Sequence, residues 1–464
     1  MYFKHFYDPD LAQGSYLIGC QESGEAVVVD PRRDVAVYLN DALANNLRIV
    51  AVTETHIHAD YLSGSRELAA ATGAQLYLSD EGGPDWLYEF EHRPLKHGSL
   101  IGVGRVNLEA LHTPGHTPEH LSFLVTDGGV TDRPGYLLSG DFVFVGDLGR
   151  PDLLDEAAGG VDTRFGGAQA LFDSLQSVFM RLPDFVQVWP GHGAGSACGK
   201  ALGAVASTTV GYEKLTAWWR GYLERGDREG FVAELLAGQP DAPSYFGRMK
   251  RQNRAGPALL GVRAPLEKLD GGALAGRVNR DLILIDSRSG ADQRAASTPG
   301  ALSLPSGDSF ATYASYFIDP EVDAREIVLL AKDEAHAYLL RDKLAYVGID
   351  KVVGYTTSLD GLPTRPIDMV APQEAGGSGL LLDVRTIGEH EAGAVPGSKQ
   401  VHAGRLGSRL DELPRGGKIV VYCQGGGRAL AAASFLRSRG FGNVVELAGS
   451  YDGWVAAGRQ DAVR

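Results

Sequence analysis

Short apolar runs recur along the first part of the chain, and each leads into residues that can bind a metal ion. Four such segments cover residues 49–60, 106–116, 136–141 and 185–192. Alternating or short apolar runs bounded by glycine and proline are typical of β-strands. Polar side chains that follow such strands can converge on one edge of a layered fold, because the sheet holds them rigidly. The pattern therefore predicts an α/β domain with a metal site at a sheet edge.

The second part of the chain contains one pattern of apolar and polar positions twice. In each copy an apolar run ends in an aspartate, Asp286 or Asp383, and a Pro-Gly pair follows. A second apolar run comes next, and then a helical pattern that ends near a glycine, the residue favoured just after a helix. Strands that alternate with helices predict a small domain with a parallel sheet. We therefore expect two such domains, related as diverged repeats.

The length of the chain fits this organisation. With 464 residues, the chain can form three domains that each bury a core. We expect an α/β multi-domain protein with domains at residues 1–250, 265–362 and 372–464. The junctions are expected near residues 245–257 and 364–379, where the composition changes.

Charge and cysteine content exclude several classes of partner. The net charge of −14 argues against nucleic acid or an anionic membrane as the main partner. No secretory signal is expected at the N-terminus, and no apolar run approaches the roughly 18 residues that cross a bilayer. Three cysteines in a long acidic chain suggest a reducing cytoplasm without disulfides. The composition thus predicts a cytoplasmic protein that acts on small molecules.

The residues after the first apolar run form the most specific part of the sequence. His56, His58 and Asp60 follow the run at residues 49–52, and Tyr61 comes next. Imidazoles and carboxylates are common metal ligands, whereas a phenol is a poor ligand near neutral pH. Further candidate ligands follow other runs, namely His116, Asp141 and His192.

Four motifs in this order resemble the metallo-β-lactamase fold over roughly the first half of the chain. They are HxHxD at residues 56–60, TPGH at 113–116, SGD at 139–141 and PGHG at 190–193. The resemblance implies an αββα sandwich with the metal site at one edge. In two-metal members of the fold, Asp60, the residue after it and His192 would hold a second ion, with Asp141 as a bridge. Because Tyr61 occupies the second of these positions, we expect chemistry at a single ion.

The segment at residues 139–152 is similar to that of the persulfide dioxygenases. This resemblance implies Fe(II), one ion per chain, with His56, His116 and Asp141 as ligands. Two histidines and a carboxylate match the facial triad, which leaves three coordination positions open. The remaining polar residues receive supporting roles: His58 as a supporting group or an extra ligand, Asp60 and His192 as hydrogen-bonding supports, and Arg150 either as a contact to the substrate or as a surface arginine.

The second of the two repeats carries a candidate nucleophile. Cys423 follows an apolar run and precedes Gly425, Gly426 and Gly427, with Arg428 next. Backbone N–H groups of such a loop, together with a helix N-terminus, stabilise anions and hence a thiolate or persulfide. The Cys-x4-Arg loop resembles that of the rhodanese sulfurtransferases over about the last ninety residues. The resemblance implies that Cys423 and Arg428 are catalytic and that the three glycines bind the substrate.

The first repeat lacks this chemistry. Ala331 takes the place of Cys423, and residues 332–336 replace the glycine loop. No nucleophile remains, and two carboxylates would repel an anion. We therefore expect a catalytically inactive rhodanese-like domain that serves as a spacer or an interface.

The other two cysteines have no clear counterpart in these motifs. Cys20 is expected to be structural. Cys198 lies in a glycine-rich segment after His192, where it is either a persulfide carrier near the iron, assisted by Lys200, or a small packing residue.

Together these expectations describe a bifunctional enzyme of sulfide metabolism. Fe(II) would support oxidation of a low-molecular-weight thiol persulfide by O2 to sulfite, and Cys423 would transfer sulfane sulfur to form or use thiosulfate. The thiol would be glutathione, coenzyme A or a bacterial thiol, and a homo-oligomer is expected. One alternative is a dinuclear zinc thioesterase like glyoxalase II with a sulfur-carrier rhodanese domain. Another is a sulfur-carrier or sensing protein with a structural metal.

Overall fold

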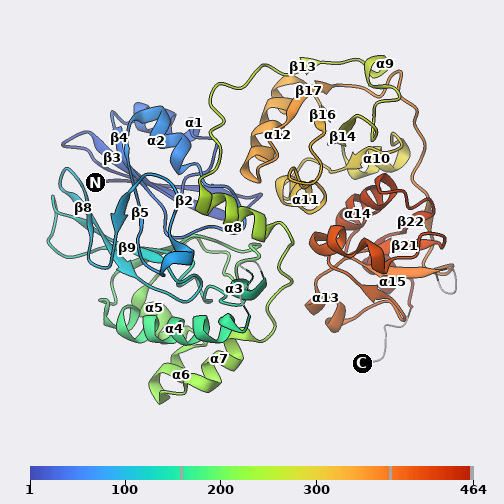
Figure 1. Ribbon diagram of the computed structural model, residues 1–464. Coiled ribbons are helices and arrows are strands. Elements are labelled where there is room, and N and C mark those ends of the chain that lie inside the picture. The colour runs from blue at the N-terminus through green and yellow to red at the C-terminus, as the bar shows by residue number, and fades with distance from the viewer. Residues whose placement is uncertain (157–158, 160, 376–378, 460–464) are drawn as a thin grey trace. The chain divides into compact units, whose positions relative to one another are not determined.

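The computed structural model describes residues 1–156, 159, 161–375 and 379–459 (Figure 1). The chain divides into two compact units. The first comprises Met1–Gln239 and Phe246–Gly261, and the second comprises Pro240–Tyr245 and Val262–Arg464. Each unit has its own sheets and its own apolar cores.

The first unit contains two six-stranded sheets. The first sheet runs in chain order, antiparallel from β1 to β3 and parallel from β3 to β6. Its strands are β1 (Tyr2–Asp8), β2 (Gln13–Cys20), β3 (Glu25–Val29), β4 (Arg48–Thr53), β5 (Gln75–Ser79) and β6 (Arg93–Leu95). The second sheet has the order β12-β11-β10-β9-β8-β7. Its strands are β7 (Leu100–Val103), β8 (Val106–His112), β9 (Leu121–Asp127), β10 (Tyr136–Gly140), β11 (Gln187–Pro190) and β12 (Thr208–Thr209).

Helices cover the outer faces of both sheets, so the unit has four layers (Figure 1). One core lies between the sheets, where Val106 and Leu108 of β8 are buried while Asn107 between them is exposed. This alternation is the reason that the run forms a strand with one face in the core. The helices on the first sheet are α1 (Ala36–Ala44) and α2 (Ser65–Thr72), and those on the second are α4 (Thr163–Ser177), α5 (Val210–Thr216), α6 (Arg220–Arg225) and α7 (Arg228–Leu236). Shorter helical turns are η1 (Pro84–Trp86), α3 (Leu153–Glu156) and η2 (Phe179–Arg181). The predicted αββα sandwich is confirmed.

A further helix, α8 (Phe246–Ala255), lies where the sequence predicts a domain junction. The chain changes unit on either side of this helix, but the helix itself belongs to the first unit. The segment contains four basic residues, and Phe246 and Met249 on the same helix are buried. The side chain of Asn253 is also buried, and it bonds to three backbone groups of the loop that carries His58. The chain thus changes unit close to the predicted junction, and the segment itself forms a helix of the first unit.

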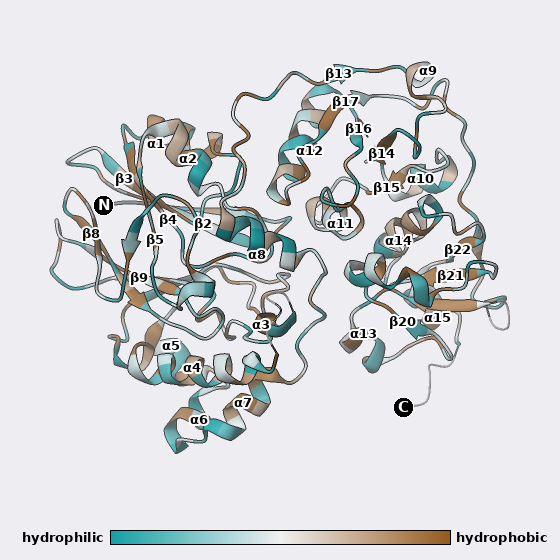
Figure 2. Ribbon diagram, viewed as in Figure 1, coloured by the Kyte–Doolittle hydropathy of each residue, from teal (hydrophilic) through white to brown (hydrophobic). Residues whose placement is uncertain are grey.

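The second unit contains two five-stranded parallel sheets with the same topology, so the predicted repeat is confirmed. In each sheet the first strand pairs with the fifth, and the order continues through the fourth, second and third strands. The strands are β13 (Glu267–Lys268), β14 (Leu282–Asp286), β15 (Leu302–Ser303), β16 (Glu326–Leu330) and β17 (Val352–Thr356) in one copy, and β18 (Met369–Val370), β19 (Leu380–Asp383), β20 (Lys399–Gln400), β21 (Ile419–Tyr422) and β22 (Val444–Leu447) in the other. Strands β21 and β22 are largely apolar (Figure 2) because parallel sheets are covered on both faces.

Three helical segments of the two copies also correspond: α10 (Gly290–Ala295) to α13 (Ile387–Ala392), α11 (Phe310–Phe317) to the 3-10 segment η3 (Ala403–Glu412), and α12 (Glu334–Tyr346) to α14 (Gly427–Ser438). Among the described residues, α9 (Gly271–Leu274) occurs in the first copy alone and α15 (Ser450–Ala456) in the second alone. Gly348 and Gly440 follow α12 and α14 with φ values of 71° and 86°, the left-handed conformation expected after a helix. Within the described residues, the structure contains no helix that is both long and apolar enough to span a bilayer.

Candidate metal centre and sulfur-transfer loop

The loop after β4 is held in place by buried acidic side chains. Asp30 accepts hydrogen bonds from the backbone N–H and the hydroxyl of Thr55, at 2.7 and 2.9 Å. Glu119 accepts a hydrogen bond of 2.7 Å from the N–H of Ile57. The histidines of the loop, His56 and His58, are fully buried. The sequence motif identifies the two histidines but not Asp30 or Glu119, which lie in other segments.

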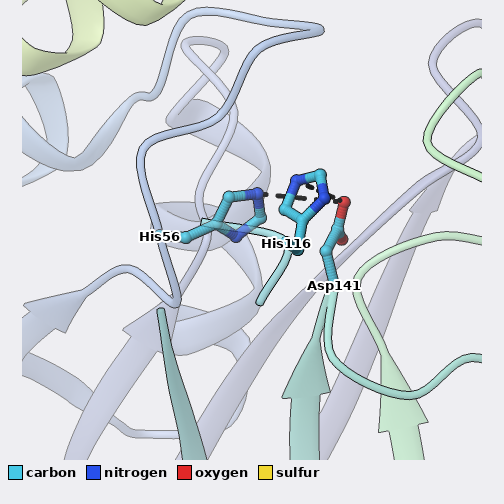
Figure 3. Close-up of side chains that lie close together, drawn as sticks. All are labelled: His56, His116 and Asp141. Atoms are coloured by element: carbon cyan, nitrogen blue, oxygen red, sulfur yellow. Dashed lines mark ion pairs between the residues drawn. The ribbon is translucent and has the colours of Figure 1, made fainter. Parts of the chain in front are cut away.

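Three predicted ligands come together at the edge of the two sheets. His56 follows β4, His116 follows β8 and Asp141 follows β10, and one ligand atom of each lies within 4.8 Å of the others. The Nε2 atoms of His56 and His116 lie 3.8 and 3.5 Å from Oδ2 of Asp141 (Figure 3). Among the described residues, no group donates a hydrogen bond to either carboxylate oxygen of Asp141. These donors are the expected type for a divalent metal ion.

Hydrogen bonds orient the ring of His116 for this role. Its Nδ1 lies 3.0 Å from the carbonyl oxygen of Arg150, so Nδ1–H donates and the Nε2 lone pair is left to face Asp141. Burial and neighbouring imidazoles keep the pKa of His56 well below its ordinary value, and burial does the same for His116. Both rings are therefore neutral near pH 7, as metal binding requires. Burial raises the pKa of Asp141 to about 6.

Sequence analysis did not single out His120, which supports the backbone of this cluster. Its Nε2 accepts a hydrogen bond of 3.0 Å from the N–H of Asp141, and its Nδ1 lies 2.8 Å from the hydroxyl of Thr113. Burial lowers the pKa of His120 to about 3, so the ring stays neutral and can accept. The TPGHTPEH segment places this histidine four residues after His116, which is the signal that could have indicated it.

His58 lies beside the cluster of His56, His116 and Asp141 rather than within it. Its Nε2 is 3.2 Å from Asp30 and 3.9 Å from Glu54. Burial opposes the charged form, but these carboxylates outweigh it and raise the pKa of His58 to about 9. Nδ1 has no hydrogen-bond partner among the described residues. Both predicted roles, support and extra ligand, therefore stay predictions.

A second group of metal-binding side chains lies next to the first. Asp60, His192 and Cys198 are buried, and their ligand atoms lie within 4.8 Å of one another. Nε2 of His192 is 3.6 Å from both Asp60 and Asp141. Neither oxygen of Asp60 has a hydrogen-bond partner among the described residues. The sequence predicts Asp60 and His192 as supports, but it does not predict that Cys198 joins them as a third donor.

Tyr61 does not contribute to this second group. Its hydroxyl receives a hydrogen bond of 3.2 Å from Gln13 and donates one of 3.3 Å to the carbonyl of Asp30. Burial and nearby carboxylates raise the pKa of Tyr61 well above its ordinary value. The phenol is therefore a poor ligand, as predicted.

Arg150 and Lys200 differ from the expectations. Arg150 is buried and donates to Asp152 at 2.9 and 2.5 Å and to the carbonyl of Ala197 at 2.9 Å, so the alternative of a surface arginine is wrong. Its contact to a substrate stays a prediction. Lys200 donates to the carbonyls of Glu234 and Ala237, so its expected assistance to Cys198 is also wrong. Burial, Asp60 and Asp141 raise the pKa of Cys198 well above its ordinary value.

A cavity of about 910 Å³ adjoins the metal-binding loops. Its wall includes Ile57 between the two motif histidines, Pro114 and Gly115 before His116, and Lys250 from α8. The ammonium of Lys250 is buried, lies 4.8 Å from the ring centroid of Trp86, and has no hydrogen-bond partner among the described residues. Burial lowers the pKa of Lys250 to about 8. The cavity has the size of a small-molecule site, and its lining includes the basic residues Lys250, Arg251 and Arg254, which suit an anionic group.

The second predicted site lies between β21 and α14. Cys423 is 2% exposed, and its Sγ receives a hydrogen bond of 3.1 Å from the N–H of Gly426. Gly426 has a φ of +100°, a conformation that favours glycine, and Gly427 begins α14. Gly425 completes the turn between Cys423 and Gly426. The thiol thus lies at a helix N-terminus, as predicted.

The side chain of Arg428 is held by an acidic neighbour, which the sequence does not indicate. Its guanidinium donates two hydrogen bonds to Glu389, at 2.6 and 2.7 Å. Hydrogen bonds from Arg428 and from Thr386 outweigh burial and lower the pKa of Glu389 to about 2. In the first copy, Ala331 follows β16 where Cys423 follows β21, and Asp333 caps α12 through a hydrogen bond from the N–H of His336. That copy has no nucleophile at this position.

Comparisons with known proteins agree with the two parts of this geometry. The metallo-beta-lactamase superfamily model matches residues 9–192, and the rhodanese-like domain model matches residues 368–457. A metallo-beta-lactamase of known structure from Staphylococcus aureus subsp. aureus COL is 36% identical, with a TM-score of 0.67, and the match covers 77% of this chain and 98% of that one. The chain belongs to the metallo-beta-lactamase superfamily. The predicted fusion to a rhodanese-like domain is confirmed.

Relatives within the superfamily have two different activities. A hydroxyacylglutathione hydrolase from Polaromonas sp. (strain JS666 / ATCC BAA-500) is 36% identical over 179 residues, which are 38% of this chain and 61% of the relative. The mitochondrial persulfide dioxygenase ETHE1 from Bos taurus is 30% identical over 193 residues, which are 41% of this chain and 67% of the relative. The chain thus spans about three fifths of the length of the hydrolase that it matches. The sequence identities to these two relatives are too similar to distinguish oxidation from hydrolysis.

The raised pKa of Asp141 predicts how metal binding depends on pH. The carboxyl binds a metal only after it loses its proton, so affinity should fall by about tenfold per pH unit below pH 6 and level off above it. Competition between the protein and a chelator for Co2+ between pH 5 and 8 measures this. Asp141→Asn should bind Co2+ more weakly, and its affinity should no longer change near pH 6. A wild-type affinity that stays flat from pH 5 to 7 would contradict the assignment of Asp141 as a ligand.

The hydrogen bonds of Asn253 predict a second effect on the metal centre. Asn253→Ala removes bonds to the backbone of His58, Tyr61 and Ser63. We expect metal affinity to fall by roughly 10- to 100-fold, as for other groups that orient ligands. The matched control is Asn107→Ala on the exposed face of β8, which should bind Co2+ like the wild type. Equal affinities for the two variants would show that α8 does not hold the motif loop.

Proposed function

We propose that the first unit is a persulfide dioxygenase that uses one Fe(II) held by His56, His116 and Asp141. The observation that carries this proposal is the convergence of two neutral imidazoles and one carboxylate whose oxygens have no hydrogen-bond donor among the described residues. A divalent ion fits this group, because it would offset the cost of burying the carboxylate. Iron held by these three residues would supply the redox chemistry that activates O2 and a persulfide. The similarity to ETHE1 supports the same chemistry.

The reaction we propose converts one persulfide and O2 into sulfite and a thiol. Written in full, RSS⁻ + O2 + H2O gives RS⁻ + SO3²⁻ + 2 H⁺, so the terminal sulfur loses four electrons to O2. At neutral pH the rings of His56 and His116 are neutral and Asp141 is an anion, so all three are in the protonation state that binds a metal ion. Asp60 and His192 lie close enough to support this centre, and Arg150 holds the ring of His116 through its carbonyl.

The substrate we propose is a low-molecular-weight thiol persulfide, such as that of glutathione, coenzyme A or a bacterial thiol. The cavity beside Ile57 and Gly115 would hold its organic part, with Lys250 near an anionic group. Arg150 is a candidate contact to the substrate. However, the guanidinium already donates to Asp152 and Ala197, so an indirect role through the loop at residues 197–198 fits the bonds better.

We further propose that the C-terminal domain, residues 372–464, transfers sulfane sulfur through Cys423. In the exchange Cys423–S⁻ + S2O3²⁻ ⇌ Cys423–S–S⁻ + SO3²⁻, the sulfur–sulfur bond of thiosulfate breaks as that of the enzyme persulfide forms. The N–H of Gly426 contacts the thiol sulfur, Gly425 and Gly427 flank it, and Arg428 lies in the first turn of α14. The domain at residues 265–362 would be catalytically inactive. Residues 1–250 together with the rest of α8 would carry the oxidation.

The cellular setting is part of the same proposal. The three cysteines are free thiols, which suits a reducing cytoplasm. We propose a cytoplasmic homo-oligomer in which sulfite made by one site is used near the other.

The second candidate is a dinuclear zinc thioesterase with a sulfur-carrier rhodanese domain. Asp60, His192 and Cys198 favour it, because a carboxylate, an imidazole and a thiolate form a set that binds zinc. A hydrolase relative at 36% identity also favours it. The lack of a usable ligand at Tyr61 does not exclude this candidate, since Cys198 supplies a third donor.

Oxygen consumption tests the proposed reaction directly. Adding glutathione persulfide to Fe(II)-loaded protein should give O2 uptake and sulfite, and both should be lost in His116→Ala. Cys423→Ser should keep O2 uptake and stop the conversion of sulfite and persulfide into thiosulfate. Hydrolysis of S-lactoylglutathione without O2 uptake would instead support the thioesterase.

Metal content separates the two candidates independently of turnover. For the dioxygenase we expect one iron per chain by elemental analysis, both in the wild type and in Cys198→Ser. For the dinuclear enzyme we expect two zinc ions in the wild type and fewer in Cys198→Ser. Cys20→Ser is the matched control, because Cys20 lies in β2 and belongs to neither metal-binding group.

A further inference from the structure

The cysteine-free copy of the second unit contacts the Cys423 loop through one arginine. Arg294 lies on α10, which belongs to the first copy. Its Nη2 donates a hydrogen bond of 2.8 Å to the carbonyl oxygen of Gly426. Nε and Nη2 also donate to Glu446 on β22, at 3.1 and 2.8 Å. Helix α10 lies next to α14 in Figure 1, as these bonds require.

Gly426 is the residue that sets the geometry around the thiol. Its N–H donates to Sγ of Cys423, and its carbonyl accepts hydrogen bonds from Arg294 at 2.8 Å and from the N–H of Leu430 in α14 at 3.1 Å. The two groups belong to adjacent peptide planes that meet at the Cα of Gly426. With φ at +100°, the residue has a conformation that other residues rarely adopt. Holding one plane through Arg294 therefore restricts the direction of the other, which points at the sulfur.

Glu446 holds Arg294 in the orientation that this requires. The carboxylate is 1% exposed, and burial raises its pKa while Arg294 lowers it again. A guanidinium bound to a buried carboxylate through two donors has little rotational freedom. Nη2, which donates to Glu446, also donates to the carbonyl of Gly426, while Nη1 donates to the carbonyl of Gly290 at 3.5 Å.

Packing along α14 keeps the two copies together around this contact. The ring of Phe317 on α11 lies 5.0 Å from that of Phe435. The N–H of Ser303 donates a hydrogen bond of 2.9 Å to the hydroxyl of Ser434. These contacts join the copies away from the thiol, whereas that of Arg294 acts on the loop itself.

We propose that Arg294 is a positioning residue for sulfur transfer at Cys423, supplied by the copy that has lost its own nucleophile. The inference rests on the sulfur transfer proposed above. It gives the cysteine-free domain a specific task, which is to hold the glycine loop so that the N–H of Gly426 stays on the sulfur. Sulfur transfer by the C-terminal domain then depends on the domain before it.

The test uses the full-length protein with Arg294→Gln and the matched control Ser434→Ala. Ser434→Ala also removes a hydrogen bond between the copies, but it leaves the loop contacts of Gly426 unchanged. Two rates are measured: turnover of thiosulfate with cyanide, and alkylation of Cys423 by iodoacetamide, followed by mass spectrometry of the peptide. For Arg294→Gln we expect turnover to fall by roughly 10- to 100-fold, the cost of a misplaced reacting group, with a changed alkylation rate. Because Ser434→Ala leaves the reacting groups in place, both of its rates should stay within about twofold of the wild type.

The outcomes are distinct. If Arg294→Gln loses no more turnover than Ser434→Ala and alkylates at the wild-type rate, the proposal is overturned. Should the variant fail to fold because Glu446 is left unpaired, Arg294→Gln combined with Glu446→Gln removes the buried charge and carries the same expectation. If the wild type turns over no thiosulfate, the sulfur-transfer function fails. The alkylation rates then still decide whether Arg294 positions the loop.

Discussion

Buried carboxylates without hydrogen-bond donors are the constraint on which the first unit depends. Asp60 and Asp141 place four oxygens in the interior, and no described group donates to any of them. Burying a charged group without compensation is costly, and part of that cost is visible in the raised pKa of Asp141. Neutral imidazoles cannot remove it. A bound cation can, so these carboxylates are well suited to hold a metal ion.

The proposed sulfur-transfer site in the second unit consists of backbone hydrogen-bond donors instead of metal-binding side chains. At Cys423 the donors are a backbone N–H and a helix N-terminus, and the nearby arginine is shared with Glu389. Such a site depends on the exact course of the backbone, because a peptide group cannot be reoriented by a side-chain rotation. This is why a contact to the carbonyl of Gly426 matters more than its single hydrogen bond suggests.

The sequence predicted the residues that occur at strand ends and missed those that reach the site from elsewhere. His56, His116 and Asp141 each follow a strand, so the topology brings them together. Cys198 was predicted to lie near the iron as a persulfide carrier or to be a packing residue, but its position as a third donor beside Asp60 and His192 was not predicted. Helix α8 was not predicted within the junction near residues 245–257, because its basic side chains conceal the buried face. No sequence motif indicated Arg294, because its proposed role depends on how one repeat packs on the other.

The chemistry of Cys198 is what separates oxidation from hydrolysis. Burial and two carboxylates raise the pKa of its thiol well above the ordinary value, so the thiol is protonated near neutral pH unless a metal binds it. A protonated thiol beside the triad of His56, His116 and Asp141 is compatible with a single iron and leaves a hydrogen-bond donor near Asp60. A thiolate at the same position requires a second ion. The one-ion and two-ion sites proposed above therefore differ in the protonation state of Cys198.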